Sequence, residues 1–236
     1  MDDSIIAAVR AHAAREAPRE CCGVVTVERG RRRYRPCRNI AGEDREFEIH
    51  AEDWAAAEDA GEIVAVCHSH PFLSPEPSDA DRAMCETTGL PWLIVNHPLG
   101  HFVELQPSGW QAPLVGRPFH HGVLDCYTLV RDFYARELGI DLPDFRRPDR
   151  WWEQGGDLYR DNFVRAGFYP VEMSALARGD MIVMRVGSKV PNHAGVYLGD
   201  QVILHHVMDR LSSRDVYGGF WLLNTTHCMR HKGMPV

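Results

Sequence analysis

The sequence predicts two domains of mixed structure, an α/β domain followed by an α+β domain, and three observations carry this prediction. The chain has 236 residues, of which 44% are apolar, enough for two hydrophobic cores of roughly 110 residues each. Residues 107–118 (PSGWQAPLVGRP) contain three prolines and two glycines without clear periodicity, which is typical of a linker. Helix and strand patterns alternate before this segment, whereas helices precede a run of short strands after it. We therefore expect domains at residues 1–108 and 119–236, joined by a linker at residues 109–118.

In the first domain, the apolar spacing of residues 5–17 predicts an amphipathic helix that Pro18 ends. Residues 51–60, closed by Gly61, predict a second helix, and a third begins near Ser78 after a proline-rich loop. Strands are expected where β-branched and apolar residues cluster or alternate, at residues 23–27 and 33–37 (a hairpin), 46–50, 62–67, 92–96 and 102–105. Residues 62–67 are apolar enough for a buried central strand, so the domain is expected to be a helix-flanked sheet.

In the second domain, residues 126–138 predict a helix, and the aromatic-rich stretch 151–168 is irregular with one further helix. Short apolar runs predict strands at residues 181–186, 194–198, 202–206 and 220–223. This order of helices first and strands afterwards is typical of an α+β domain.

The charge distribution argues against nucleic-acid binding. The net charge is −7, and residues 1–110 hold 11 basic and 19 acidic side chains, a net of −8. A nucleic-acid binder needs a basic face, and the short basic run 31–33 is better explained as the solvated end of a hairpin. No apolar run approaches the length of a membrane span, and the acidic N-terminus does not have the basic region of a secretory signal, so we expect synthesis as a soluble protein in a cytoplasm.

Seven cysteines, an odd number without a repeating CxxC spacing, do not predict a disulfide framework, and most are expected to be small buried residues.

The segment from Cys67 to Asp81 predicts a metal site. His68 and His70 lie two apart at the end of a strand, so their side chains point to the same side and can bind one cation. Asp81 can supply an oxygen ligand from the next helix. Two histidines and a carboxylate leave a fourth position open for water, which is the ligand count of a catalytic zinc site, and zinc lowers the pKa of such a water to about 7. Glu20, just before the first strand, is the candidate general base. Ser78 with Asp81 is also a helix capping box, and the two roles can coexist.

Glu20, His68-x-His70 and, seven residues later, Ser78-x-x-Asp81 together resemble the JAMM (MPN-type) metalloproteases. The resemblance implies Zn²⁺ on His68, His70 and Asp81, with Glu20 as acid and base and Ser78 stabilising the oxyanion.

A second candidate site centres on Cys126. This cysteine opens the helix expected at residues 126–138, where the helix dipole and unpaired N–H groups favour the thiolate. A cysteine nucleophile needs a histidine base with an orienting partner. His193 opens a strand, and His205, 12 residues on, lies across a tight hairpin. The alternatives are a buried packing cysteine and half-buried strand histidines. His120 and His121 do not predict a second metal site, because adjacent side chains diverge.

Asp125-Cys126, His193-Ala-Gly-Val-Tyr-Leu-Gly-Asp and a polar residue 12 positions after His193 resemble the NlpC-type papain-like peptidases, which cleave peptide bonds in bacterial cell-wall peptides. The resemblance implies Cys126 as nucleophile, His193 as base and His205 as orienting residue. His206 is adjacent to His205 and points to the opposite face, so the choice between them rests on the spacing in that family.

The two modules in this order resemble the tail assembly proteins of lambda-like phages and prophages, a likeness that extends to residues 61–65, 121–129, 143–145, 151–152 and 190–194. It implies a role at the tail tip, in assembly or in breaching peptidoglycan, with tail-tip proteins and peptidoglycan peptides as partners. It also implies synthesis in the host cytoplasm and action in the virion or periplasm. Two alternatives stay open: a structural tail-tip component whose peptidase sites are vestigial or only process tail proteins, and an isopeptidase acting on ubiquitin-like modifiers.

Overall fold

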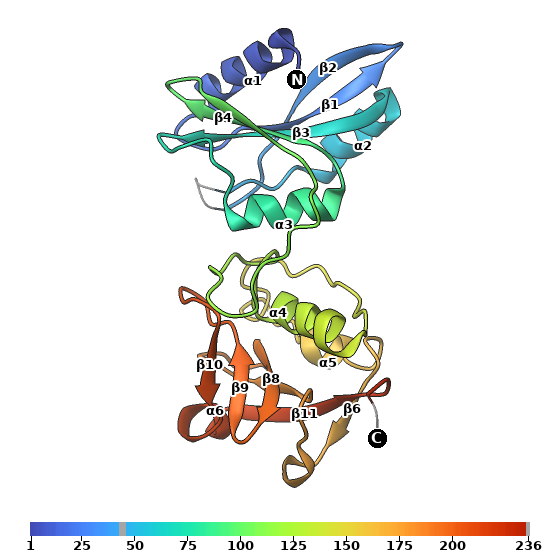
Figure 1. The fold of residues 1–236 in the computed structure, drawn as a ribbon, viewed down its shortest axis with the longest axis vertical. Coiled ribbons are helices and arrows are strands. Elements are labelled where there is room, and N and C mark those ends of the chain that lie inside the picture. Colours follow the sequence, from blue (N-terminus) through green and yellow to red (C-terminus); the bar gives the residue numbers. More distant parts are fainter. Residues whose placement is uncertain (43–45, 235–236) are drawn as a thin grey trace. The chain divides into compact units, whose positions relative to one another are not determined.

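The computed structural model describes residues 1–42 and 46–234 and divides the chain into two compact units (Figure 1). The N-terminal unit is Met1–Gln111 and the C-terminal unit is Ala112–Val236. Each unit has a sheet and a hydrophobic core of its own, so each is described by itself. Of the helices in the described residues, none combines the length and the apolar character that crossing a bilayer requires.

The N-terminal unit is built on a mixed sheet with helices on both faces (Figure 1). The described strands lie in the order β2-β1-β3-β4-β5, with β3 and β4 parallel and the other neighbours antiparallel. The helices are α1 (Asp3–Glu16), α2 (Ala51–Ala60) and α3 (Asp79–Thr88). The strands are β1 (Cys22–Glu28), β2 (Arg31–Cys37), β3 (Glu62–Pro71), β4 (Trp92–His97) and β5 (Phe102–Leu105).

The two faces of β3 are covered by different helices, and this fixes where its histidines point. On one face Ala65 and Cys67 pack with α1, whose Val9 is fully buried. On the other face Val66 packs with Cys85 of α3. Because strand side chains alternate, His68 and His70 continue the row that Val66 begins and face α3.

The C-terminal unit is built on an antiparallel sheet with the order β10-β9-β8-β7-β11-β6. The helix α4 (Cys126–Phe133) continues as a π-helical turn, η1 (Tyr134–Leu138). The other short helices are α5 (Leu158–Asn162), the 3₁₀ turn η2 (Met173–Ala175) and α6 (Gly219–Leu223). The strands are β6 (Phe168–Val171), β7 (Met181–Met184), β8 (His193–Gly199), β9 (Val202–His205), β10 (Ser213–Val216) and β11 (Thr225–His231).

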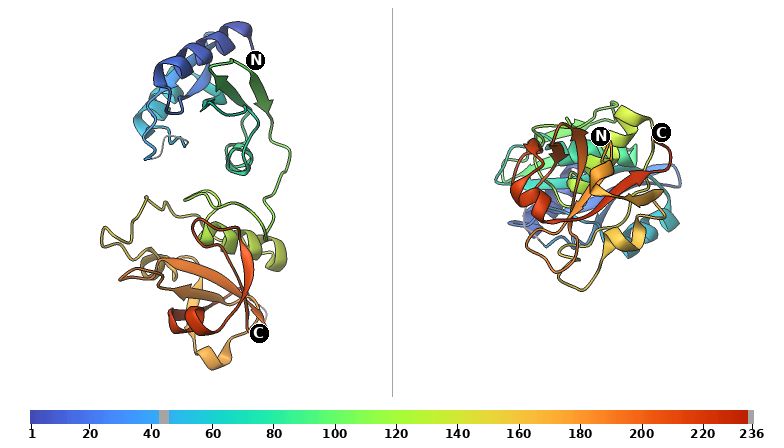
Figure 2. Two further views of the ribbon diagram at one scale, coloured as in Figure 1. Left: turned by 90° about the vertical axis from the view of Figure 1, so that its left-hand side faces the viewer. Right: turned by 90° about the horizontal axis from the view of Figure 1, so that it is seen from below.

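Helix α4 covers one face of this sheet, as Figure 2 shows. Its buried Leu129 and Phe133 share a core with Val196 of β8 and Leu204 of β9. This packing brings the first residue of α4 toward the start of β8. On the opposite face Trp221 of α6 packs with Ile203, Met184 and their neighbours.

Strands β8 and β9 form a hairpin with a two-residue turn. Gly199 pairs with Val202, and the intervening Asp200 and Gln201 both adopt positive φ, at 49° and 57°. Two consecutive left-handed residues are the signature of a type I′ turn, whose twist suits the flanking strands.

Most helices and strands lie where the sequence predicts them, but the strand expected at residues 46–50 is wrong. Only the isolated bridge Asn39–Ile49 forms there. The side chain of Asn39 explains the difference, because its Nδ2 donates to the Glu46 carbonyl at 2.9 Å and its Oδ1 accepts from the Glu48 N–H at 3.1 Å. Two backbone hydrogen bonds, from Ile40 to Glu48 and from His50 to Arg38, form the bridge, and beyond them the Asn39 side chain takes the place of a longer strand ladder.

The strand expected at residues 220–223 is also wrong, since these residues form α6. The backbone turns at Gly218–Gly219, where Gly219 has a φ of 49°, and the Asn224 side chain bonds back to the Phe220 carbonyl at 2.8 Å. The edge and flanking strands β6, β10 and β11 were not predicted, because their sequences are polar or lack clear alternation.

Candidate active sites

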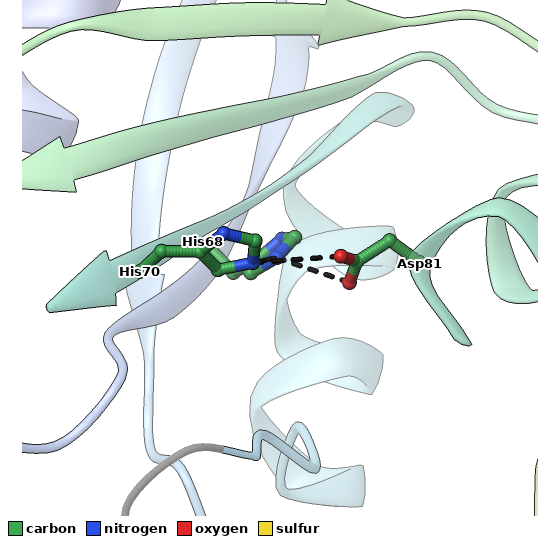
Figure 3. A group of neighbouring side chains, drawn as sticks. All are labelled: His68, His70 and Asp81. Atoms are coloured by element: carbon green, nitrogen blue, oxygen red, sulfur yellow. Dashed lines mark hydrogen bonds and ion pairs between the residues drawn. The ribbon is translucent and has the colours of Figure 1, made fainter. Parts of the chain in front are cut away.

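In the N-terminal unit, His68, His70 and Asp81 bring their ligand atoms together (Figure 3). The two Nε2 atoms lie 3.1 Å apart. His68 Nε2 is 3.2 Å from Asp81 Oδ1, and His70 Nε2 is 3.4 Å from Asp81 Oδ2. All three residues are buried, at no more than 8% exposure. Within residues 1–42 and 46–234, this is the one such group of potential metal ligands.

This geometry fits a small tetrahedral cation such as zinc. Zinc bonds of 2.0–2.1 Å place neighbouring ligand atoms about 3.3 Å apart, which is close to the spacing of this group. The orientation of His70 fits as well, because its Nδ1 lies 2.8 Å from the Ser74 carbonyl and donates to it. That bond leaves the Nε2 lone pair directed at the cluster.

Aromatic neighbours hold the His68 ring. Phe47 stacks on it at a centroid distance of 4.6 Å, and Trp92 meets it edge-on at 5.4 Å. These contacts restrict the plane of the ring.

Asp81 is held by the capping box that begins α3. Its Oδ2 accepts from the Ser78 N–H at 2.7 Å and from the Ser78 hydroxyl at 2.8 Å, while the Asp81 N–H donates to Ser78 Oγ at 3.1 Å. Burial works to raise the pKa of Asp81, but the two histidines and Ser78 hold it well below the usual range. Asp81 is therefore an ionised carboxylate, and Ser78 fixes its position.

Glu20 lies against the same cluster. It is only 5% exposed, and burial raises the pKa of its carboxyl, opposed by the charges of His68 and His70. The backbone beside it is tied to β3, because the Cys21 N–H donates to Ser69 Oγ at 2.8 Å and the Ser69 N–H donates to the Cys21 carbonyl at 3.1 Å. Ser69 stands between the two histidines, so these bonds fix the segment carrying Glu20 relative to both.

In the C-terminal unit, Cys126 is the first residue of α4. The preceding Asp125 caps the helix by accepting from the Thr128 N–H at 2.9 Å, and Arg147 Nε donates to it at 2.6 Å. Asp125 is 2% exposed and Cys126 is partly exposed. The Tyr159 hydroxyl lies 3.4 Å from the Cys126 sulfur. The backbone N–H of Ala194 also bonds to that sulfur, which puts the thiol beside the residue that follows His193.

The expectation of a lowered thiol pKa is wrong for this structure. Burial and the neighbouring Asp125 carboxylate raise the pKa of Cys126 to about 11, which outweighs the hydrogen bonds from Tyr159 and Ala194. The thiol is therefore neutral at pH 7.

His193 and His205 are in direct contact. The hairpin opposes Gly195 to His205, and His193 Nε2 lies 3.0 Å from His205 Nδ1. Burial, aided by His205 and His206, lowers the pKa of His193 to about 3, and burial also lowers the pKa of His205. Both rings are therefore neutral at pH 7. Trp221 packs on both, at centroid distances of 5.9 and 4.4 Å.

His206 turns elsewhere and meets Phe119 edge-on at 5.1 Å. Of the two adjacent histidines, it is thus His205 that bonds to His193. His205 Nε2 in turn lies 3.1 Å from Asp215 Oδ2.

Sequence reasoning missed four side chains around the Cys126 site: Arg147, Tyr159, Asp215 and Trp221. Asp215 and Trp221 belong to β10 and α6, two elements that the sequence patterns did not predict. Arg147 and Tyr159 lie in or beside the irregular aromatic stretch. The local signal for Tyr159 is its place within a short helix, which says nothing of its distance from Cys126.

Comparison with known proteins gives matches over both units. Residues 2–107 match the family described as prokaryotic homologs of the JAB domain, and residues 116–230 match the NlpC/P60 family. These matches confirm the two predicted fold classes.

Two curated proteins are similar over most of the chain. Tail tip assembly protein K of Escherichia phage N15 is 42% identical over 235 residues, covering 98% of this chain and 96% of that protein. Tail tip assembly protein K of Escherichia phage lambda is 45% identical over 181 residues, covering 77% of this chain and 88% of that protein. Desampylase of Haloferax volcanii is 36% identical over 101 residues, covering 39% of this chain and 73% of that protein.

Proposed function

The chain belongs to the family of tail tip assembly proteins K, and on that premise we propose that it is a two-site peptidase of a phage tail tip. The domain at residues 119–236 is a cysteine endopeptidase acting on peptidoglycan stem peptides. The domain at residues 1–108 is a zinc-dependent metallopeptidase. The observation that best supports this proposal is the 3.0 Å contact between His193 and His205, together with the hydrogen bond from the N–H of Ala194, the residue after His193, to the sulfur of Cys126.

Cys126 is the nucleophile of the C-terminal site. Neutral His193 accepts the thiol proton as the sulfur attacks the peptide carbonyl, and it then delivers that proton to the departing amine. His205 orients the His193 ring through their hydrogen bond. The unpaired N–H groups of the first turn of α4 are donors for the oxyanion. Water then hydrolyses the thioester, with His193 again as base.

At the N-terminal site His68, His70 and Asp81 would hold zinc, which would supply a Lewis acid and lower the pKa of a bound water. Glu20 takes the proton of the attacking water, and the raised pKa of its buried carboxyl suits it to return that proton to the leaving amine. Ser78 fixes Asp81 through its N–H and its hydroxyl, so the oxyanion role that the resemblance implies requires the hydroxyl to turn away from Asp81.

Other tail-tip proteins are the expected partners, with synthesis in the host cytoplasm and action in the virion or periplasm. The neutral resting pair of Cys126 and His193 favours a second candidate function. In that alternative the chain is a structural tail-tip component whose peptidase sites are vestigial or only process tail proteins.

Digestion of purified peptidoglycan distinguishes the peptidase proposal from the structural alternative. Full-length protein is incubated with murein, and the released fragments are identified by mass spectrometry. The peptidase proposal expects new peptide ends with the wild type and none with Cys126→Ala. Cys228→Ala is the matched control, since Cys228 is a buried cysteine of the same unit in a different cluster. Equal release by wild type and Cys126→Ala contradicts the assigned nucleophile, and no release by either favours the structural alternative.

A further inference from the structure

The hydrogen-bonded chain that starts at His193 does not stop at His205. It ends at Asp215 on the edge strand β10. Asp215 Oδ2 lies 3.1 Å from His205 Nε2. The pairing of β10 with β9 sets Ser213 opposite His205, and the Ser213 hydroxyl donates to Asp215 Oδ1 at 3.0 Å. One carboxylate oxygen is thus held by Ser213 and the other by His205.

The protonation states along this chain follow from its two ends. Partial burial works to raise the pKa of Asp215, but the hydrogen bonds from His205 and Ser213 keep it below the usual range, so the group is an ionised carboxylate at pH 7. An ionised carboxylate only accepts hydrogen bonds, so His205 must carry its proton on Nε2. His205 is neutral, which makes its Nδ1 an acceptor. His193 must then donate from Nε2, and its Nδ1 is left with a free lone pair.

From this chain we propose that Asp215 is a positioning residue that selects, through His205, the tautomer of His193 able to act as a base. The proposal rests on the assigned function of the Cys126 site. Nδ1 is the one nitrogen of His193 not engaged by His205, so in the proposed mechanism it is the nitrogen left to accept the thiol proton.

Without the carboxylate the opposite order of donors and acceptors becomes accessible. Nothing then holds the His205 proton on Nε2, and the tautomer protonated on Nδ1 donates to His193 Nε2. His193 must in that case carry its own proton on Nδ1, and the nitrogen left for Cys126 is a donor rather than a base. The effect of Asp215 is therefore transmitted by proton placement across two rings, without contact with the substrate.

Substitution of Asp215 is compatible with folding, because its side chain is 25% exposed on an edge strand. Asp215→Asn keeps the shape. The Ser213 hydroxyl favours the amide oxygen at the Oδ1 position, which turns the NH₂ group toward His205 Nε2. This donor forces the His205 proton to Nδ1. Asp215→Ala removes the acceptor without adding a donor.

The test is ¹⁵N NMR of histidine-labelled, full-length protein at pH 7, which reports the tautomer of each ring. We expect the Nε2–H tautomer of His193 in the wild type, mainly the Nδ1–H tautomer in Asp215→Asn, and both tautomers in Asp215→Ala. Asp200→Asn removes an equal charge at the exposed hairpin turn and is expected to match the wild type. A wild-type His193 tautomer in both Asp215 variants overturns the proposal.

Kinetics on a stem peptide give a second readout. Loss of a general base costs about 10²–10⁴-fold in rate, so kcat is expected to fall by at least 10²-fold in Asp215→Asn with little change in KM. A change in KM alone, with kcat unchanged, also overturns the proposal. If the wild type cleaves no stem peptide, the peptidase assignment fails, whereas the tautomers still decide the role of Asp215.

Discussion

The buried ion pair between Arg147 and Asp125 offers the sharpest test of how the Cys126 site is held. Their side chains are 8% and 2% exposed, and the Nε–Oδ2 distance is 2.6 Å. Arg147→Met keeps most of the volume but leaves the Asp125 carboxylate buried and uncompensated. Removing one partner of a buried pair costs about 3–5 kcal/mol, so the free energy of unfolding of the C-terminal unit is expected to fall by that amount.

The variant should also reverse the pH dependence of stability. In the wild type Arg147 and the capping hydrogen bonds overcome burial and depress the pKa of Asp125, so this contribution is present above the unfolded pKa of about 3.9 and is lost as the pH falls through the folded value. In Arg147→Met burial dominates and raises that pKa. As the pH falls from 7 to 5, the variant is therefore expected to gain stability from protonation of Asp125. The wild type is expected to gain none from this group.

Hydrogen exchange of the α4 amides, followed by mass spectrometry on the full chain, measures this unit separately. A loss of about 3 kcal/mol accelerates the slowest amides by roughly 10²-fold. Asp144→Asn is the matched control, because Asp144 also pairs with Arg147, at 2.7 Å, but is 52% exposed. An exposed pair is worth at most about 1 kcal/mol. If Arg147→Met exchanges no faster than Asp144→Asn, the reasoning from burial is wrong.

Three further results are expected. Elemental analysis should find about one zinc per chain in the wild type and none in His68→Ala, and a wild type purified with ample zinc but without bound metal contradicts the site. Gly195→Ala places a Cβ 2.9 Å from His205 Cβ and 2.8 Å from Ile203 Cδ1, so denaturant unfolding should show a loss of about 1–3 kcal/mol together with lost activity. Because burial raises the pKa of Cys126 to about 11, its alkylation by iodoacetamide should quicken steadily from pH 7 to pH 10, whereas a plateau below pH 8 argues for a stabilised thiolate.

The sequence predicts the grouping of His68, His70 and Asp81 better than the surroundings of Cys126, for a physical reason. His68 and His70 follow from the period of a strand, and Asp81 follows from a capping box, so the relevant patterns are local. Glu20 is different. Its place beside the histidines depends on the register that pairs Cys22 with His68, which local patterns do not reveal. Its place before the first strand made it a candidate base, and the resemblance to a known family implied its role.

At the cysteine site the local signals gave the position of Cys126 but the wrong direction for its pKa. The helix N-terminus is present, yet burial and the Asp125 carboxylate decide the balance. Asp215 could not be anticipated, because it reaches His205 from an edge strand whose residues, Ser213–Val216, show no apolar pattern. Contacts of this kind depend on tertiary packing, which composition and spacing do not encode.

Two histidines, His205 and His206, are adjacent at the end of β9. A one-residue shift in the pairing of β8 with β9 therefore has different consequences in the two directions. The two-residue turn at Asp200 and Gln201 and the β-bulge between Tyr197 and Gly199 together set which residue stands opposite Gly195, and without the bulge that residue would be His206. A slip of one residue turns every side chain of a strand to its other face. In one direction such a slip brings His206 into the place of His205 and preserves an imidazole partner for His193. In the other direction it brings Leu204, and the proton chain to Asp215 is broken.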